Sequence, residues 1–433
     1  MRALALLAAF TAAALLPRAP LGIDVPIVAA LVAATVATSM RRSLDAALFG
    51  SLAVALACMP ALLDAGWVAV VDIIAACLLA AAAVAGPRFV ALLAPFRALE
   101  RVPELVPEVP SGSTPVLRGV AFGTVLVLPF GVLFWTADAA FAEIGRSAPI
   151  PSLSSLPARV LVFALVLFGA LGLALAAKRV FADLTLPTRK LGLSEWAIPL
   201  ALLDALFLAF VLVQVTVLFG GRGHVLETAG LTYSEYARQG FWQLIAAAAL
   251  TLVVVATAAR AAEVRKRSHA ILLHALLGAL CVLTIVTVVS AVHRLDLYED
   301  AFGLTRLRLA AETFSWGLGG LFVLVLLAGA IGFVGRNLVR ISVVGVAAGL
   351  LAFSLSNPDG RIAERNVDRW RTTADLDVAY LQGLSADAVP ALAELPEPLR
   401  SEVLAPLRAR LTEDEPWTSA NYGRHRARGV LES

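Results

Sequence analysis

The chain has 433 residues, of which 60% are hydrophobic and only 15% are charged. Soluble globular proteins carry about 25% charged residues, so this composition excludes an ordinary soluble domain and favours an integral membrane protein. The formal net charge of +3 is too small for a nucleic-acid-binding surface. We therefore expect membrane lipid around the chain and no nucleic acid as a partner.

About eleven apolar runs approach bilayer length and predict an all-α fold, a polytopic helical membrane bundle. The first run is the weakest, because about 14 helical residues reach only ~21 Å and fit either a tilted anchor or a signal peptide. No convincing small-x-small cleavage site precedes Arg18, so we expect this segment to be retained. The predicted spans are 3–16, 23–39, 44–62, 66–85, 116–137, 158–177, 195–219, 240–259, 270–292, 309–334 and 339–355.

The distribution of basic residues predicts the orientation, because Lys and Arg resist translocation across the membrane. They concentrate after the second, fourth, sixth, eighth and tenth spans and are sparser in the opposite set of connections. This pattern places the N-terminus inside and the C-terminal tail outside. Lysine occurs only at Lys178, Lys190 and Lys266, whereas arginine and alanine abound. That bias is typical of GC-rich bacterial genes, so we expect the bacterial cytoplasmic (inner) membrane.

Irregular stretches predict four regions. An Ala-rich transmembrane block of about four helices occupies 1–86, and a Pro-rich cytoplasmic connector occupies 87–115. The main transmembrane block of about seven helices covers 116–356, and a small helical extracytoplasmic module covers 357–433. In this tail an apolar residue recurs every fourth position, which predicts a helix that Pro406 would kink or split. The recurring residues are Leu399, Val403, Leu407 and Leu411.

Polar residues gather at one predicted depth, near the outer ends of the spans. Thr232 and Glu235 have the capping-box spacing, so a helix should begin there and carry three polar side chains on one face. Those side chains either bond neighbouring helices or line a ligand site. Farther along, Gly303 can turn the chain, after which Arg308 and Glu312 are four positions apart and can pair, structurally or functionally.

We expect these groups to surround one extracytoplasmic cavity, because polar side chains are costly in lipid and turn toward the bundle interior. The candidate ligand or cavity residues are Asp138, Tyr233, Glu235, Tyr236, Arg238, Gln239, Gln243, Arg294, Tyr298, Glu299, Asp300, Arg306, Arg308 and Glu312.

Two isolated acids, Asp72 and Asp204, lie inside predicted spans. Each is either a protonated core residue or part of a proton path. The three cysteines have no CxxC spacing and are expected to be small buried hydrophobic residues. The sequence contains no phosphate loop, zinc-protease motif or nucleophile elbow. We therefore expect no cofactor and no metal site.

Several short polar motifs occur in order along the sequence and resemble a family signature. They are LFGG at 218–221, GLTYSEYARQGFWQL at 230–244, GLTRLR at 303–308, NPD at 357–359 and LSADAVP at 384–390. In this the chain is similar to bacterial polytopic membrane proteins classed as domain of unknown function four-one-seven-three, which is related to four-one-five-three. The resemblance covers about residue 116 to the C-terminus. It implies a multi-pass inner-membrane protein without an assigned reaction, so it transfers no catalytic residues.

Three functions are compatible with these features. In the first function, which we favour, the protein binds or passes a small polar solute through the outward-facing cavity. The protein would then be a carrier and not an enzyme. Alternatively, it is a membrane-embedded enzyme acting on a lipid-linked or envelope substrate, with a carboxylate beside an arginine as acid or base. In the third, it is a structural or signalling component whose tail binds an envelope partner through its apolar stripe, while Arg424, Arg426 and Arg428 meet acidic envelope polymers or lipid headgroups. The alternative for the tail is that the stripe packs on the tail's own helices and the arginines are solvated.

Overall fold

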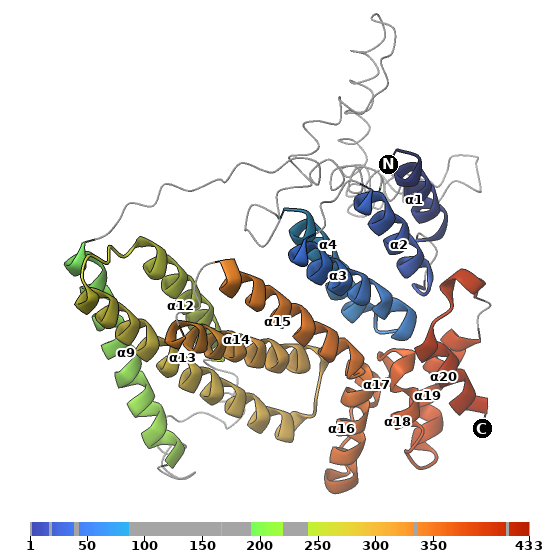
Figure 1. Ribbon diagram of the computed structural model, residues 1–433. Helices are drawn as coiled ribbons and strands as arrows, with labels where there is room; N and C mark the ends of the chain where they lie inside the picture. The colour runs from blue at the N-terminus through green and yellow to red at the C-terminus, as the bar shows by residue number, and fades with distance from the viewer. Residues whose placement is uncertain are drawn as a thin grey trace, which may run out of the picture. The chain divides into compact units, whose positions relative to one another are not determined.

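The computed structural model describes residues 2–16, 20–38, 43–85, 166, 192–219, 241–331, 336–412 and 415–432. The elements in these ranges are all helices, so the predicted all-α class is confirmed there (Figure 1). The chain forms two compact units. Unit 1 comprises Met1–Ala182, Leu350–Asn357 and Val378–Ser433, and unit 2 comprises Asp183–Gly349 and Pro358–Asp377.

Unit 1 begins with four apolar helices that pack in chain order. They are α1 (Arg2–Leu15), α2 (Asp24–Ala37), α3 (Leu44–Leu62) and α4 (Gly66–Ala85). The hydroxyl of Ser43 caps α3 by accepting a hydrogen bond from the Ala46 amide at 3.1 Å. Since three residues join α3 to α4, the two helices run back along each other. The last turns of α15 (Arg336–Leu355) also belong here, with the Phe353 ring centroid 5.9 Å from that of Trp67.

The remainder of unit 1 is a tail module of short helices. It contains α17 (Val378–Gln382), η3 (Ala386–Ala388), α18 (Val389–Leu392), α19 (Leu399–Leu411), η4 (Trp417–Ser419) and α20 (Tyr422–Glu432). Helix α19 continues through Pro406 as one element, so the expected split does not occur. Val403, Leu407 and Leu411 are 0%, 1% and 6% exposed. The predicted apolar stripe therefore packs inside the module and does not face outward toward a partner.

Unit 2 is a bundle of long helices whose core is apolar. It contains α9 (Leu193–Phe219), α12 (Phe241–Ala261), α13 (Arg267–Phe302), α14 (Arg306–Ala330), the first part of α15, and α16 (Pro358–Thr373). Leu280 and Phe322 are fully buried at the centre of its hydrophobic cluster. With 36 residues, α13 is about 54 Å long, well beyond a ~30 Å hydrocarbon core. The helix thus continues past its predicted end at residue 292, and the polar segment is its last turns.

Nine of the predicted spans correspond to described helices, and the spans 116–137 and 158–177, apart from residue 166, lie outside the described residues. Within the described part, five helical stretches are long and apolar enough to cross a membrane: Leu44–Leu62, Gly66–Val84, Arg267–Asp296, Arg306–Ala330 and Asn337–Leu355. Ala3–Leu15, Asp24–Ala37, Trp196–Leu212 and Ala247–Ala259 are shorter apolar helices. These lengths identify a helical membrane protein.

Gly22 allows a close approach between two backbone segments, unlike three glycines of the apolar helices. Side chains added at Gly329, Gly345 or Gly349 would meet no described atom within 4 Å, so these small residues do not mediate close helix contacts there. By contrast, a Cβ at Gly22 would overlap the Ser419 carbonyl, and the Ile23 amide donates to the Ala420 carbonyl at 3.1 Å. The turn between α1 and α2 is thus in direct contact with the tail module.

Candidate functional site

In unit 2, the predicted cavity residues between Arg294 and Glu312 lie where α13 ends and α14 begins. Gly303 has φ +75°, a conformation that favours glycine. Thr305 caps α14 by accepting from the Arg308 amide. Asn366 of α16 donates to the Leu304 carbonyl at 2.8 Å, which fixes this turn against the start of the tail. The predicted turn at Gly303 is therefore confirmed.

Arg306 joins the same turn to α16 through an ion pair with Asp359. The guanidinium Nε donates to Asp359 Oδ1 at 2.9 Å, and Nη2 donates to Oδ2. Asp359 is 0% exposed, so this two-point contact helps to compensate its buried charge. This geometry gives Arg306 a structural role in holding α16.

Arg308 contacts the C-terminal end of α13 and not Glu312. Its guanidinium donates to the Phe302 carbonyl at 3.1 Å and to the Gly303 carbonyl, and lies 4.4 Å from the centroid of the Tyr298 ring. The last carbonyls of a helix have no partner within it, so a cation there is favourable. The pairing expected from the four-residue spacing is replaced by this helix-end contact.

Glu299 is the group at this helix mouth whose bonding is incomplete. Its Oε1 atom is buried and has no hydrogen-bond partner among the described residues. Burial raises the pKa of Glu299 to about 7, and the nearby acids Glu312 and Asp296 add to the shift, while Arg365 and Arg308 oppose it. Both charge states of this carboxyl are therefore populated near neutral pH.

The other predicted cavity residues divide into two groups. Arg294, half-buried on α13, and Glu312, half-buried on α14, belong to the same two helices as the groups above. Asp138, Tyr233, Glu235, Tyr236, Arg238 and Gln239 lie outside the described residues, as do the side chains of Gln243 and Asp300.

The two isolated acids inside the apolar helices have different surroundings. Asp72 of α4 is fully buried and accepts a hydrogen bond at 2.9 Å from the hydroxyl of Ser354 on α15, while its Oδ2 has no described partner. In unit 2, both carboxyl oxygens of Asp204 on α9 are buried without a hydrogen-bond partner in the described part of the chain. The sequence shows no partner for Asp72, because Ser354 is 282 positions away.

A second polar site, in unit 1, was not predicted. Asp387 Oδ2 accepts hydrogen bonds from the backbone amides of Asp64 and Ala65, at 2.7 and 2.9 Å, and from the Ser385 hydroxyl at 3.0 Å. In return, Asp64 Oδ2 accepts from the Ala386 amide at 3.0 Å. Asp387 thus accepts from backbone amides in the turn before α4, and Asp64 accepts from the first amide of η3. Burial and the nearby Asp64 carboxylate raise the pKa of Asp387 to about 6.

Arg424 closes this site from α20. It is 3% exposed, pairs with Asp64 and Glu415, and donates to the carbonyls of Leu21 and Ser419. Asn421 of the same segment donates to the carbonyls of Pro60 and Leu63, at 2.8 and 2.9 Å. The tail module is therefore bonded to both turns that precede α2 and α4.

These contacts correct the expectation that three tail arginines face outward. Arg424 is buried, and Arg428 pairs with Glu415 at 2.9 Å, so only Arg426 of the three is exposed. The sequence contained one signal for the site in unit 1, the LSADAVP motif at 384–390, which contains Asp387 and resembles the family pattern. Its docking partner in the α3–α4 turn could not be found from spacing.

The described residues contain no group of three or more His, Cys, Asp or Glu side chains that could hold a metal ion. The free cysteines also differ from one another: Cys281 is buried and Cys58 is half-buried, whereas Cys77 is exposed on α4. The expected burial is confirmed for Cys281 and wrong for Cys77.

The long apolar helices and the polar turns between them define a helical membrane protein. Residues 4–395 match the family described as Domain of unknown function (DUF4153), and the chain belongs to this family. The match is to the related family and not to four-one-seven-three, and it includes the N-terminal block that the resemblance left out. It ends before α19, so Asn421 and Arg424 lie beyond it. No curated protein and no solved structure matches the chain.

Proposed function

We propose that the protein crosses the bacterial cytoplasmic membrane about eleven times, with the N-terminus inside and the tail outside. Support comes from the turns that the tail contacts. In unit 1 the tail bonds to Leu21 and Asp64, and in unit 2 α16 bonds to Leu304. In the orientation predicted from basic residues, all three turns lie on the outer side, as the tail does.

This topology is tested with single cysteines in a background that lacks the native three. Arg408 is exposed on α19 and Arg265 is exposed in the turn before α13. We expect a membrane-impermeant maleimide to label Arg408→Cys in intact spheroplasts and Arg265→Cys only after lysis. Labelling of both, or of Arg265→Cys alone, would refute the orientation.

We propose that the protein binds a small polar solute at the outer mouth of α13 and α14 and passes it across the membrane. The observation that carries this proposal is the buried Glu299 oxygen without a described partner. A buried acceptor without a partner costs roughly 1–3 kcal/mol, so a solute that donates a hydrogen bond there regains that energy. Arg308, which lies over the Tyr298 ring, is close enough to Glu299 to oppose the rise in its pKa.

The pKa of Glu299 distinguishes two kinds of solute by the proton that binding releases or retains. Since the pKa of Glu299 is about 7, a cationic solute favours the carboxylate and displaces a proton when it binds. A neutral hydrogen-bond acceptor would instead select the protonated form. Asp72 and Asp204 are the proposed carriers of a proton along each unit, because Asp72 Oδ2 and both Asp204 oxygens are buried without a hydrogen-bond partner among the described residues.

The test is a thermal-shift panel of small amines, amino acids and sugars on the full chain in nanodiscs. We expect one chemical class to raise the melting temperature of the wild type and of Glu364→Gln, which changes an exposed acid on α16, but not of Glu299→Gln. Calorimetry in two buffers at pH 7 should then detect proton release when the solute is cationic. A panel in which no solute distinguishes Glu299→Gln from the control would overturn the proposal.

A further inference from the structure

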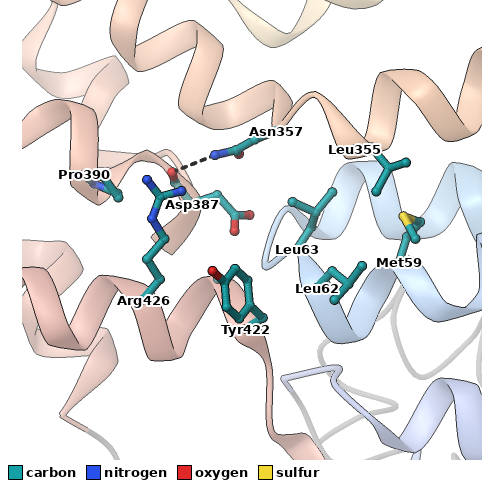
Figure 2. Close-up of a pocket in the computed structure, with 10 residues that line it drawn as sticks. Met59, Leu62, Leu63, Leu355, Asn357, Asp387, Pro390, Tyr422 and Arg426 are labelled. Atoms are coloured by element: carbon teal, nitrogen blue, oxygen red, sulfur yellow. Dashed lines mark hydrogen bonds between the residues drawn. The ribbon is translucent and has the colours of Figure 1, made fainter.

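Unit 1 contains a pocket of about 240 Å³ at the junction of two apolar helices with the tail module (Figure 2). One wall is apolar and comes from the ends of α3 and α15: Met59, Leu62, Leu63 and Leu355. The other wall is mostly polar and comes from Asn357, which follows α15, and from the tail module: Asp387, Pro390, Tyr422, Gly423 and Arg426. The pocket is therefore amphiphilic, with its two characters on opposite sides.

The apolar wall lies at the ends of two candidate membrane spans. The candidate spans Leu44–Leu62 and Asn337–Leu355 both end at residues that line the pocket. Leu62 and Leu355 are 40% and 60% exposed, so the apolar surface continues outside the pocket along the two helices. Polar and aromatic side chains begin where these spans stop, which is the depth of lipid headgroups.

The polar wall supplies one cation that pairs with no acid in the described part of the chain. Arg424 and Arg428 of α20 pair with Glu415, whereas Arg426 is exposed and has no ion-pair partner among the described residues. Figure 2 shows the Arg426 and Tyr422 side chains rising from α20 toward Asp387, opposite the leucines.

The acid in this wall is already occupied. Asp387 is 5% exposed, and its Oδ2 accepts from two backbone amides and a hydroxyl, so this oxygen is not available to a ligand. The Asn357 side chain donates to the Asp387 carbonyl at 3.2 Å. The groups left to bind a ligand are thus the Arg426 guanidinium and the Tyr422 hydroxyl, both donors.

We propose that this pocket binds one molecule of an anionic phospholipid. Its phosphate lies on Arg426 and Tyr422, since a guanidinium matches phosphate geometry with two parallel donors. One acyl chain lies on Leu62 and Leu355 and enters the bilayer beside α3 and α15. The volume holds a headgroup and not a whole lipid, which agrees with a chain that leaves the pocket along the helices. A free phosphate shares the Arg426 contact but leaves the apolar wall uncovered.

The experiment is native mass spectrometry of the full chain in detergent, titrated with phosphatidylglycerol, phosphatidylethanolamine or glycerol 3-phosphate. Arg426→Gln is compared with Arg408→Gln, which removes an exposed arginine of α19 that does not line the pocket. We expect the wild type and Arg408→Gln to retain one phosphatidylglycerol that Arg426→Gln binds about tenfold more weakly. Phosphatidylethanolamine should bind more weakly to all three.

A second variant separates a lipid site from a phosphate site. Leu355→Gln changes the apolar wall and leaves Arg426 in place, so it should weaken phosphatidylglycerol and not glycerol 3-phosphate. Equal lipid binding by Arg426→Gln and Arg408→Gln would overturn the site. Binding of glycerol 3-phosphate as tight as that of phosphatidylglycerol, unaffected by Leu355→Gln, would overturn the lipid in favour of a soluble phosphate.

Discussion

Arg424 offers the sharpest test of how the tail module is held. The substitution Arg424→Met removes a buried guanidinium that pairs with Asp64 and Glu415 and donates to two carbonyls. Removal of one partner from a buried ion pair costs about 3–5 kcal/mol. Glu415 keeps Arg428 at 2.9 Å, and Asp64 keeps the Ala386 amide at 3.0 Å. We therefore expect the lower part of that range, about 3–4 kcal/mol.

The assay is amide hydrogen exchange of the full chain in nanodiscs, followed at α20 and at Ile23, whose amide donates to the tail carbonyl of Ala420. A loss of 3–4 kcal/mol, at about 1.4 kcal/mol per tenfold, speeds exchange through local opening by roughly 10²- to 10³-fold. The control is Arg408→Met on α19, an exposed position where the free energy of unfolding should change by less than about 0.5 kcal/mol.

The result that would refute this reasoning is unchanged protection of both segments in Arg424→Met. Such protection would mean that the hydrogen bonds of Asn421 and Asp387 hold the tail without the arginine. Faster exchange in α20 alone, with Ile23 still protected, would restrict the role of Arg424 to the module and exclude a role in docking.

Three further substitutions test single contacts. Gly423→Ala places a Cβ on the buried Asp387 carboxylate and should lower the free energy of unfolding by about 1–3 kcal/mol. Gly429→Ala on the same helix meets open space and should raise the free energy of unfolding slightly. A calorimetric scan that ranks the two variants the other way would contradict the contact. The pKa of Asp387, raised to about 6, means that the folded state binds more protons than the unfolded state, whose pKa is about 4. The stability that this group contributes is thus complete below about pH 4 and is lost as the pH rises through 6. Asp387→Asn should therefore flatten the plot of melting temperature against pH between pH 4 and 6. An unchanged slope in this plot would count against the prediction. Arg306→Lys replaces the two-point contact with Asp359 by a single one and should lower the free energy of opening of α16 by about 1–2 kcal/mol. Faster proteolysis of α16 would detect this change. Resistance equal to that of the wild type would rule it out.

Helices α3 and α4 show what the sequence determines by itself. Their predicted limits, 44–62 and 66–85, are those of the structure. Hydropathy is a local property, and a run of about 20 apolar residues must become a helix in lipid because its backbone has no other hydrogen-bond partners. The Gly303 turn and the Thr305 cap follow from equally local chemistry. The class of the protein and the order of these elements were therefore predictable.

The polar contacts were decided by the tertiary structure. Arg308 turned to the carbonyls of Phe302 and Gly303 because α13 continues as a helix to that point, which apolarity alone did not predict. The tail arginine that looked solvent-facing became buried because the fold brings Asp64 to it.

The amides that Asp387 caps are 322 and 323 positions away in the sequence. No periodicity or spacing encodes such a pair, since it exists only after α3, α4 and the tail have been folded into one unit. The sequence determined which segments are long and apolar enough to enter lipid, because hydropathy depends on each segment separately. Only the folded chain determined which polar groups meet, because a buried hydrogen bond requires two segments to be in place at once.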